Sequence, residues 1–396
     1  MDFATKTIHA GQPSEPQTGA IVPPIFQTTT YQQEAPGEHK GFDYTRTSNP
    51  TRKRLEAVLA ELEGATHAAV LGSGLAAENA VLTAYLKPGT EIIVPGDVYG
   101  GTFRLLHKVF EPIGCIVTRV DFTKPGALEQ ALSAKTKLVW LESPTNPRLL
   151  VYDIAAIARV AHAAGALVVV DNTFATPFFQ RPFELGADLV VHSVTKYLAG
   201  HSDLIQGAVI AKDAAVFEPV AFLQNALGGT PSPFDCWLTL RGLRTLELRM
   251  LRHAENAIAV ADALSKHPRV KQVYFPGLAS HPGHDIARKQ MSGFGGMVSF
   301  EIDGTPEEAS TFVSSLKYFA LGESLGGVRA LVCLPCKMTH ASIPAATRAE
   351  LGLSDTLVRL SPGCESPRDL VRDVVEGLDR LGARAAAPAR LEAVTI

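Results

Sequence analysis

The chain has 396 residues, of which 46% are hydrophobic and 19% charged. A chain of this length has room for two or three structural units with a substantial buried core. Lysine and arginine total 37 and aspartate and glutamate 40, and the formal net charge of −3 argues against a surface built for nucleic acid or anionic lipid. The 33 glycines and 26 prolines exclude collagen-like and low-complexity structure.

Cysteine usage and the apolar runs bear on the location of the protein. The five cysteines are an odd number spread over a long chain, so a disulfide framework is not expected. The segment 1–6 lacks the pattern of a signal peptide, and the longest apolar runs, such as 165–170, are far shorter than the ~18 residues of a membrane helix. We therefore expect a soluble cytoplasmic protein.

The first 50 residues are rich in Pro, Gln, Thr and Gly without a sustained period, which predicts an extended arm. Residues 52–62 carry leucine and valine at helical spacing. A short apolar strand at 68–71 then meets Gly72-Ser73-Gly74, and a second helix is expected over 75–86.

Short apolar runs then alternate with helical segments. The expected strands are 91–94, 115–120, 137–141, 167–170, 189–192 and 205–210, and the helices between them include 102–110, 126–134 and 154–164. Runs of Val, Leu and Ile without polar alternation fit a sheet covered on both faces. The alternation predicts an α/β fold with a mostly parallel, doubly wound sheet.

Beyond about residue 247 the pattern changes. A long helix over 247–267, strands over 270–274 and 296–302, and helices over 306–316 and 370–381 indicate a smaller α+β domain. The expected division is therefore an arm over 1–48, a large domain over 49–247 and a small C-terminal domain over 248–396. The alanine-rich stretch 383–389 is expected to fray.

Four features follow strands of the predicted sheet, where ligands of such folds bind. Gly72-Ser73-Gly74 opens a helix and suits a phosphate, although a plain strand-to-helix turn would look the same. Asp171 ends an apolar strand, so its carboxyl needs solvent, a hydrogen bond or a cation. Asn146 follows another strand, where a simple Asn-Pro turn is the alternative.

Lys196 is the fourth feature and comes shortly after the strand 189–192. Desolvation favours the neutral amine, which is a nucleophile, whereas the alternative is an ordinary surface lysine. A phosphate cradle, an acid and a lysine on one sheet edge together match the needs of pyridoxal 5′-phosphate. In such sites the lysine binds the cofactor covalently, and the acid keeps the pyridine nitrogen protonated.

The sequence resembles the trans-sulfuration (Cys/Met metabolism) family of pyridoxal-phosphate enzymes almost from end to end. The matching motifs are Thr7 to Gly11, Tyr44 to Thr51, Asp97 to Thr102, Ser193 to Gly200, Ser324 to Gly327, Met338 to His340 and Val358 to Glu365. The resemblance implies the fold of fold type I enzymes and a homotetramer built from dimers with shared active sites, in which the arm contacts the neighbouring subunit.

The resemblance also implies a role for individual residues. Lys196 would be the Schiff-base lysine, Asp171 the partner of the ring nitrogen, and Tyr99 the residue that stacks on the ring and moves protons. The phosphate would be held by Gly74, Leu75, Ser193 and Thr195, and by Tyr44 and Arg46 from a neighbouring subunit. The substrate would be bound through its α-carboxylate by Arg359, assisted by Ser324 and by Asn146, which would also lie near the ring hydroxyl.

The family resemblance leaves the reaction open between two main types. We favour a carbon–sulfur lyase that acts on cystathionine or a related γ-substituted amino acid and forms 2-oxobutyrate and ammonia. The alternative is a γ-replacement transferase of the cystathionine γ-synthase or O-acylhomoserine sulfhydrylase type, which uses the same residues. A β-lyase, a methionine γ-lyase and a non-catalytic protein that binds the cofactor are less favoured.

Two positions depart from the family pattern. Methionine γ-lyases typically carry cysteine where this chain has Gly101. Cystathionine enzymes usually carry glutamate where this chain has Arg329, and the hypothesis is that Arg329 favours substrates with an anionic or neutral distal end. Arg104 is a further candidate for a distal carboxylate, and for both arginines a surface role is the alternative. Cys333 and Cys336 have zinc-ligand spacing without a second pair, so no metal site is expected.

Overall fold

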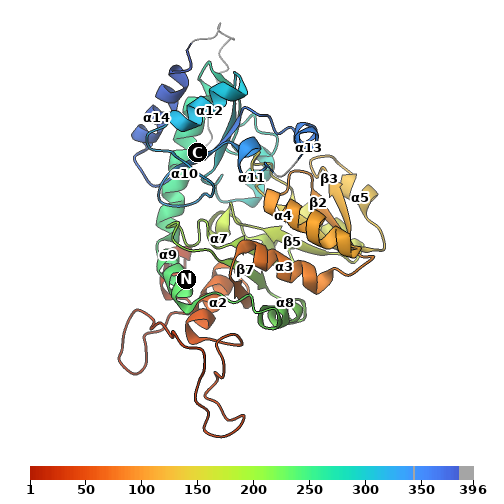
Figure 1. Ribbon diagram of the computed structural model, residues 1–396, viewed down its shortest axis with the longest axis vertical. Coiled ribbons are helices and arrows are strands. Elements are labelled where there is room, and N and C mark those ends of the chain that lie inside the picture. Colours follow the sequence, from red (N-terminus) through yellow and green to blue (C-terminus); the bar gives the residue numbers. More distant parts are fainter. Residues whose placement is uncertain (342–343, 383–396) are drawn as a thin grey trace.

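The computed structural model describes residues 1–341 and 344–382 and contains two β-sheets (Figure 1). The larger sheet has seven strands in the order β1-β7-β6-β5-β4-β2-β3. Its strands are β1 (His67–Leu71), β2 (Glu91–Pro95), β3 (Ile116–Val120), β4 (Thr136–Glu142), β5 (Leu167–Asp171), β6 (Leu189–Ser193) and β7 (Gly207–Ala211). β7 runs antiparallel to β1 and to β6, and the remaining pairs are parallel, so the predicted mostly parallel sheet is confirmed.

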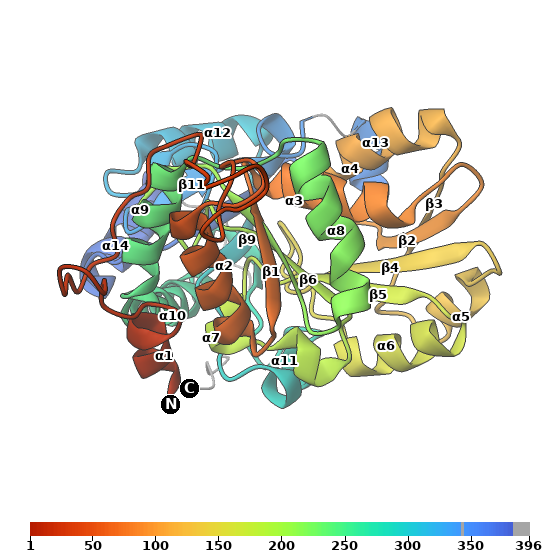
Figure 2. The same cartoon turned by 90° about the horizontal axis from the view of Figure 1, so that it is seen from below.

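Helices cover both faces of this sheet, which explains the continuous apolar character of its strands (Figure 2). One face packs against α3 (Gly74–Tyr85), α8 (Ala214–Ala226) and the segment formed by α4 (Gly100–Leu105) and the π-helical turn Leu106–Phe110. The other face packs against α2 (Pro50–Glu63) and α6 (Ile154–Ala163). The sheet is therefore doubly wound, as the alternation of strands and helices predicts.

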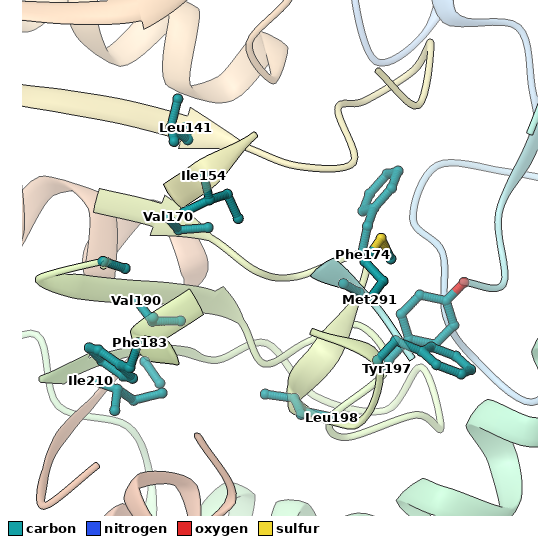
Figure 3. Packing of buried hydrophobic residues seen from close by; sticks show 14 of the residues in the cluster. Leu141, Ile154, Val170, Phe174, Phe183, Val190, Tyr197, Leu198, Ile210 and Met291 are labelled. Carbon is teal, nitrogen blue, oxygen red and sulfur yellow. The ribbon is translucent and has the colours of Figure 1, made fainter. Parts of the chain in front are cut away.

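Side chains of the central strands alternate between these two cores. Val170 and Val190 lie on the α2–α6 side, whereas Val169 and Val191 lie on the α3–α8 side. Figure 3 shows how the first of these cores extends from Leu141 and Ile210 towards Tyr197 and Met291, beyond the strand ends. The core thereby anchors the segment that follows β6, where Lys196 lies.

The N-terminal segment is partly different from the expected extended arm. Residues Phe3–His9 form helix α1, and the Phe3 ring lies 5.2 Å from the Phe178 ring between their centroids. Thr7 and Ala10 are buried as well. The remainder up to α2 has no helix and extends away from the body of the protein (Figure 1). The expectation was wrong for α1 because its apolar contacts lie far away in the sequence.

The second sheet has five strands in the order β10-β11-β12-β9-β8. These strands are β8 (Val270–Tyr274), β9 (Val298–Ile302), β10 (Ala320–Leu321), β11 (Leu331–Cys333) and β12 (Leu357–Ser361). Its core includes residues of α10 (Leu246–Ser265), α12 (Pro306–Ser315) and α14 (Pro367–Asp379). This second core has the α+β composition expected after residue 247.

Several elements were not anticipated from periodicity. They are α7 (Thr176–Phe179), α9 (Pro233–Leu243), α11 (His284–Gln290), α13 (Ala345–Glu350), α8 and the strands β10, β11 and β12. The helix expected over 126–134 is shorter, as α5 (Ala127–Ala131). The fraying expected at 383–389 concerns residues outside the described part of the chain. No helix within 1–341 and 344–382 is both long and apolar enough to cross a membrane.

Candidate active site

Polar side chains from several strands meet at one edge of the large sheet. β2, β4, β5 and β6 are parallel, and β1 has the same direction because β1 and β6 are both antiparallel to β7. The carboxyl ends of these five strands therefore share one edge, which is where ligands bind in open α/β sheets. This topology brings together the segments that follow each strand, as the sequence predicts.

Lys196 follows β6 and has a largely buried amine. Its Nζ lies 2.9 Å from the Oγ of Ser324, which precedes β11. Burial, together with the nearby positive charge of Arg359, lowers the pKa of the Lys196 amine to about 8. The neutral, nucleophilic fraction of the amine near neutral pH is therefore much larger than for an ordinary lysine, and it reaches one half at about pH 8.

Ser324 connects Lys196 to Arg359 and adopts an unusual backbone conformation. Its φ is 97°, a value that side chains other than glycine rarely adopt. Its carbonyl accepts a hydrogen bond of 3.0 Å from Nη2 of Arg359, while its hydroxyl contacts Lys196. Strained residues of this kind persist where the surroundings hold them in place. The strained turn therefore places the Ser324 hydroxyl against Lys196 and its carbonyl against Arg359.

Arg359 lies on β12, is 2% exposed and has its guanidinium fixed by a second residue. Its Nη1 donates to Oδ1 of Asn146 over 2.8 Å. The carbonyl of Asn146 accepts in turn from Nε2 of His340 over 3.1 Å. Burial and the charge of Arg359 lower the pKa of His340 to about 4, so this ring is neutral. The guanidinium is thus positioned for a planar, two-pronged contact with a carboxylate.

The start of α3 and the end of β6 form one cradle. A Cβ atom added to Gly74 would come within 3.0 Å of the Ser193 Cβ and 3.1 Å of its Oγ, so glycine is needed for this approach. The Ser73 hydroxyl accepts from the N–H of Ala76, and the N–H groups of Gly74 and Leu75, which have no partner within the helix, suit an anion. The Thr195 hydroxyl, in contrast, donates to the carbonyl of Gln206 over 3.1 Å.

Two acids lie side by side at the ends of β4 and β5. Glu142 and Asp171 are register partners, and burial raises the pKa of both carboxyls. Glu142 accepts hydrogen bonds from the backbone N–H groups of Tyr99 over 2.9 Å and Asn146 over 2.7 Å. Burial and the nearby acid Glu78 raise the pKa of the Tyr99 hydroxyl, which therefore keeps its proton. Glu142 thereby fixes the positions of two predicted site residues.

This set of groups fits pyridoxal 5′-phosphate. The Lys196 amine, the anion cradle at Gly74 and the partly buried acid Asp171 would supply what its aldehyde, its phosphate and its ring nitrogen require. Arg104 is exposed on α4, and its charge lowers the pKa of Tyr99, so it lies within electrostatic reach of that hydroxyl.

The structure does not connect three predicted residues to this site. Tyr44 is 42% exposed on the arm, and the Arg46 guanidinium lies 5.5 Å from the centre of its ring. Nε of Arg46 donates to Oδ1 of Asn225 in α8 over 3.4 Å. Arg329 is exposed, and no hydrogen bond or ion pair joins it to another residue of the described chain. For these residues the assignments made from the sequence stay predictions.

Sequence reasoning assigned no role to Glu142 or Glu323, and it took His340 only as part of the motif Met338 to His340, which was interpreted as shaping the site entrance. Glu142 ends an apolar strand in the same way as Asp171, so a signal was present. Glu323 directly precedes the motif Ser324 to Gly327 and His340 ends the motif Met338 to His340, although a motif alone indicates no contact. In the structure the negative charge of Glu323 raises the pKa values of Lys196 and Tyr99, which places it at the site.

Comparison with known proteins agrees with this geometry. The family model described as "Cys/Met metabolism PLP-dependent enzyme" matches residues 4–379. The chain belongs to this family. It is 48% identical over 379 residues to the cystathionine gamma-lyase of Dictyostelium discoideum, covering 96% of this chain and 98% of the relative. It is also 48% identical over 376 residues to the cystathionine beta-lyase of Coxiella burnetii, covering 94% and 97%.

A solved structure extends the comparison to the fold. The cystathionine gamma synthase of Xanthomonas oryzae pv. oryzae, in complex with cystathionine, superposes with a TM-score of 0.94 at 46% identity, over 96% of this chain and 98% of that one. Family membership confirms the predicted fold type I architecture, the pyridoxal-phosphate cofactor and an enzymatic function.

Proposed function

We propose that this enzyme cleaves the Cγ–S bond of cystathionine or a closely related γ-substituted amino acid. With cystathionine and water, the products are cysteine, 2-oxobutyrate and ammonia. Several relatives are named for cystathionine chemistry, including gamma-lyases and beta-lyases. The bond that breaks, and whether another thiol captures the product instead, distinguish the alternatives.

The observation that carries the proposal is the placement of charge around Lys196. Arg359 lowers and Glu323 raises the pKa of the Lys196 amine, so a cation and an acid both lie within reach of it. Arg359 is buried and suits an α-carboxylate, whereas Glu323 is exposed and suits an ammonium group at the distal end of a long substrate. A substrate with a carboxylate near Cα and a distal ammonium matches both.

The residues of the chain divide the work of this reaction. Pyridoxal phosphate, when bound, supplies an electron sink for the charge that develops at Cα. Arg359 and Asn146 would orient the α-carboxylate, and the Lys196 amine would take the Cα proton. The amine then assists loss of a Cβ proton, and the Tyr99 hydroxyl protonates the departing sulfur. The Lys196–Ser324 contact orients the amine between these steps.

A product assay tests the proposal. Purified enzyme loaded with cofactor is incubated with cystathionine, and 2-oxobutyrate and pyruvate are measured separately. We expect 2-oxobutyrate in excess, whereas pyruvate as the main product would show β-cleavage. A second incubation contains O-acetyl- or O-succinylhomoserine and cysteine. Formation of cystathionine there at a higher kcat/KM than its cleavage would assign the enzyme to the γ-replacement type.

We also propose that the active site is shared between subunits of a homotetramer built from dimers. The arm exposes apolar residues, Ile21, Val22, Ile25 and Phe26, and α8 and its end expose Phe222 and Leu227. Such surfaces are costly in water and are typical of interfaces. In this arrangement Tyr44 and Arg46 reach the phosphate of a neighbouring subunit, and the arm 1–48 and the units 49–247 and 248–396 act as separate parts.

We further propose a cytoplasmic location, which the five free cysteines fit.

Subunit mixing tests the shared site. Arg46→Ala and Lys196→Ala each inactivate or impair every site of their own oligomer. In a dimer formed from one subunit of each kind, one site regains both residues and the other lacks both. Mixing under conditions that exchange subunits is therefore expected to restore up to about a quarter of wild-type activity, since half of the dimers are mixed. Unchanged activity in mixtures with proven exchange would contradict a shared site.

A further inference from the structure

Glu78 is a buried acid of the site that the proposed reaction leaves without a role. It lies on α3, one turn after Gly74 and Leu75, and is 4% exposed. Its described hydrogen bond is with the Thr102 side chain at the start of α4. Its other oxygen, Oε2, is fully buried and has no hydrogen-bond partner in the described part of the chain. A buried acceptor of this kind costs free energy unless a ligand satisfies it.

The charges that face Glu78 make this cost larger. The negative charge of Asp171 on β5 disfavours a negative charge on Glu78. It disfavours a negative charge on Glu142 of β4 in the same way. Burial and Asp171 raise the pKa of Glu78 to about 8. Two neutral side chains also face Glu78. They are Thr102 of α4 and Tyr99, which directly precedes α4. The imidazole of His192 on β6 acts on Asp171.

Within the described part of the chain no cation acts on the Glu78 carboxyl, whereas the charge of His192 lowers the pKa of Asp171 and His192 also contacts Glu63. Glu78 and Glu142 are buried and Asp171 is partly buried, and the charge of Asp171 acts on both of the other carboxyls, whereas Arg359 acts on Lys196. Glu142 accepts from two backbone N–H groups and Asp171 from the N–H of Thr173, whereas Oε2 of Glu78 is buried without a hydrogen-bond partner in the described part of the chain. A bound ligand with a positive charge would offset the desolvation free energy of this unpaired acid.

We propose that Glu78 is an auxiliary acid for the ring nitrogen of pyridoxal phosphate and acts together with Asp171. This rests on the proposed placement of the cofactor between Lys196 and Asp171. The positive charge of the protonated ring nitrogen compensates both carboxyls, so the apoenzyme selects the protonated ring. Glu78 is a positioning residue: it acts on the charge of the ring and of Asp171 and takes no part in bond breaking.

The alternative is that Glu78 merely fills space beside Thr102. In that case its charge is irrelevant, and glutamine would pack in the same place at a lower desolvation cost. The two explanations differ in one measurable way. An electrostatic role requires a nitrogen in the ring of the ligand, whereas a packing role affects any ligand of the same shape.

The test compares two ligands of the apoenzyme. One is pyridoxal phosphate, and the other is its carbocyclic analogue, in which C–H replaces the ring nitrogen. Equilibrium affinities are measured by absorbance for wild type, Glu78→Gln, Asp171→Asn as positive control and Glu218→Gln, an exposed carboxyl on α8, as matched control. We expect Glu78→Gln to weaken the affinity for pyridoxal phosphate about tenfold and the affinity for the analogue less than about twofold. The reason is that a nearby opposite charge shifts the pKa of a group by about one to three units, and one unit corresponds to about a tenfold change in affinity.

Thermal unfolding supplies a second measurement. At pH 8 the apoenzyme of Glu78→Gln is expected to melt at or above the wild-type temperature because a frustrated acid has been removed, and its holoenzyme is expected to melt below wild type. Equal loss of affinity for both ligands, or for neither, overturns the role of Glu78. If wild-type apoenzyme binds neither ligand, or binds without modifying Lys196, the proposed function itself fails, so the two failures are distinguishable.

Discussion

Replacement of Arg359 tests the assignment of the substrate-binding cation most directly. Its guanidinium has five N–H donors, of which one on Nη1 and one on Nη2 already contact Asn146 and Ser324. A further hydrogen bond joins the guanidinium to the Cys333 thiol, and the donors that are left are available to a carboxylate. Hydrogen bonds to charged groups are worth about 1.5–3 kcal/mol each, so losing two costs about 3–6 kcal/mol. We expect Arg359→Gln to lower kcat/KM for cystathionine by about 10² to 10⁴, at about 1.4 kcal/mol per tenfold.

Arg359→Lys keeps the charge but not the planar fork, so about one of the two contacts is lost and kcat/KM falls by about 10 to 10². The assay compares cystathionine with an analogue whose α-carboxylate is an amide. The kcat/KM of wild type should exceed that of the variant strongly with cystathionine and only weakly with the amide analogue. Cofactor content and the melting temperature report damage caused by unpairing Asn146 and Ser324. Equal losses for both substrates in a folded, cofactor-loaded variant would falsify the assignment.

Three further predictions concern the Lys196 amine and the two positions, Gly101 and Arg329, that depart from the family pattern. Uptake of pyridoxal phosphate by the apoenzyme should accelerate as pH rises through about 8, where Lys196 loses its proton, and Glu323→Gln should move this midpoint to lower pH because the acid raises the pKa; stopped-flow absorbance at several pH values checks both. Gly101→Cys should lower kcat at least about tenfold without creating methionine cleavage, since its Cβ would lie 2.4 Å from Cε1 of the Tyr99 ring; activity near wild type would contradict this. Arg329→Glu should raise the kcat/KM ratio of cystathionine to O-acylhomoserine by roughly twofold to tenfold, the range of a partly screened surface charge, and an unchanged ratio would refute a role for Arg329.

The central part of the site was predictable because it depends on strand ends. Lys196 and Asp171 each follow a run of apolar residues, and parallel strands bring such ends to one edge. The same reasoning reaches Glu142, which ends β4 and is the register partner of Asp171. It was missed because a lone acid after a strand has many explanations, whereas adjacency in a sheet depends on strand order, which periodicity does not contain.

Other features depend on contacts between distant segments. Ser324 is 35 residues from Arg359 and 128 from Lys196, and it joins them only through a turn with positive φ. Helix α1 needs partners that lie far along the chain, so its sequence resembles that of the rest of the arm. Glu78 in the middle of α3 looks like a solvated helix residue until the sheet buries it. Local pattern carries no information on these points.

The distribution of charge explains how one site can hold a cofactor and a substrate in a single orientation. Acids gather where β4 and β5 end, and the buried cation Arg359 comes from β12 of the other sheet. A ligand that is positive at one end and carries a carboxylate at the other meets favourable charge in only one direction, and the reverse placement would set acid against carboxylate. The pKa of Lys196 of about 8 reflects burial first, and then the opposing charges of Arg359, which lowers it, and Glu323, which raises it. Reversing the charge on either side should therefore change the orientation in which the ligand binds more than it changes the stability of the bond between Lys196 and the cofactor. That difference distinguishes a site that fixes the orientation of its ligand from one that binds it nonspecifically.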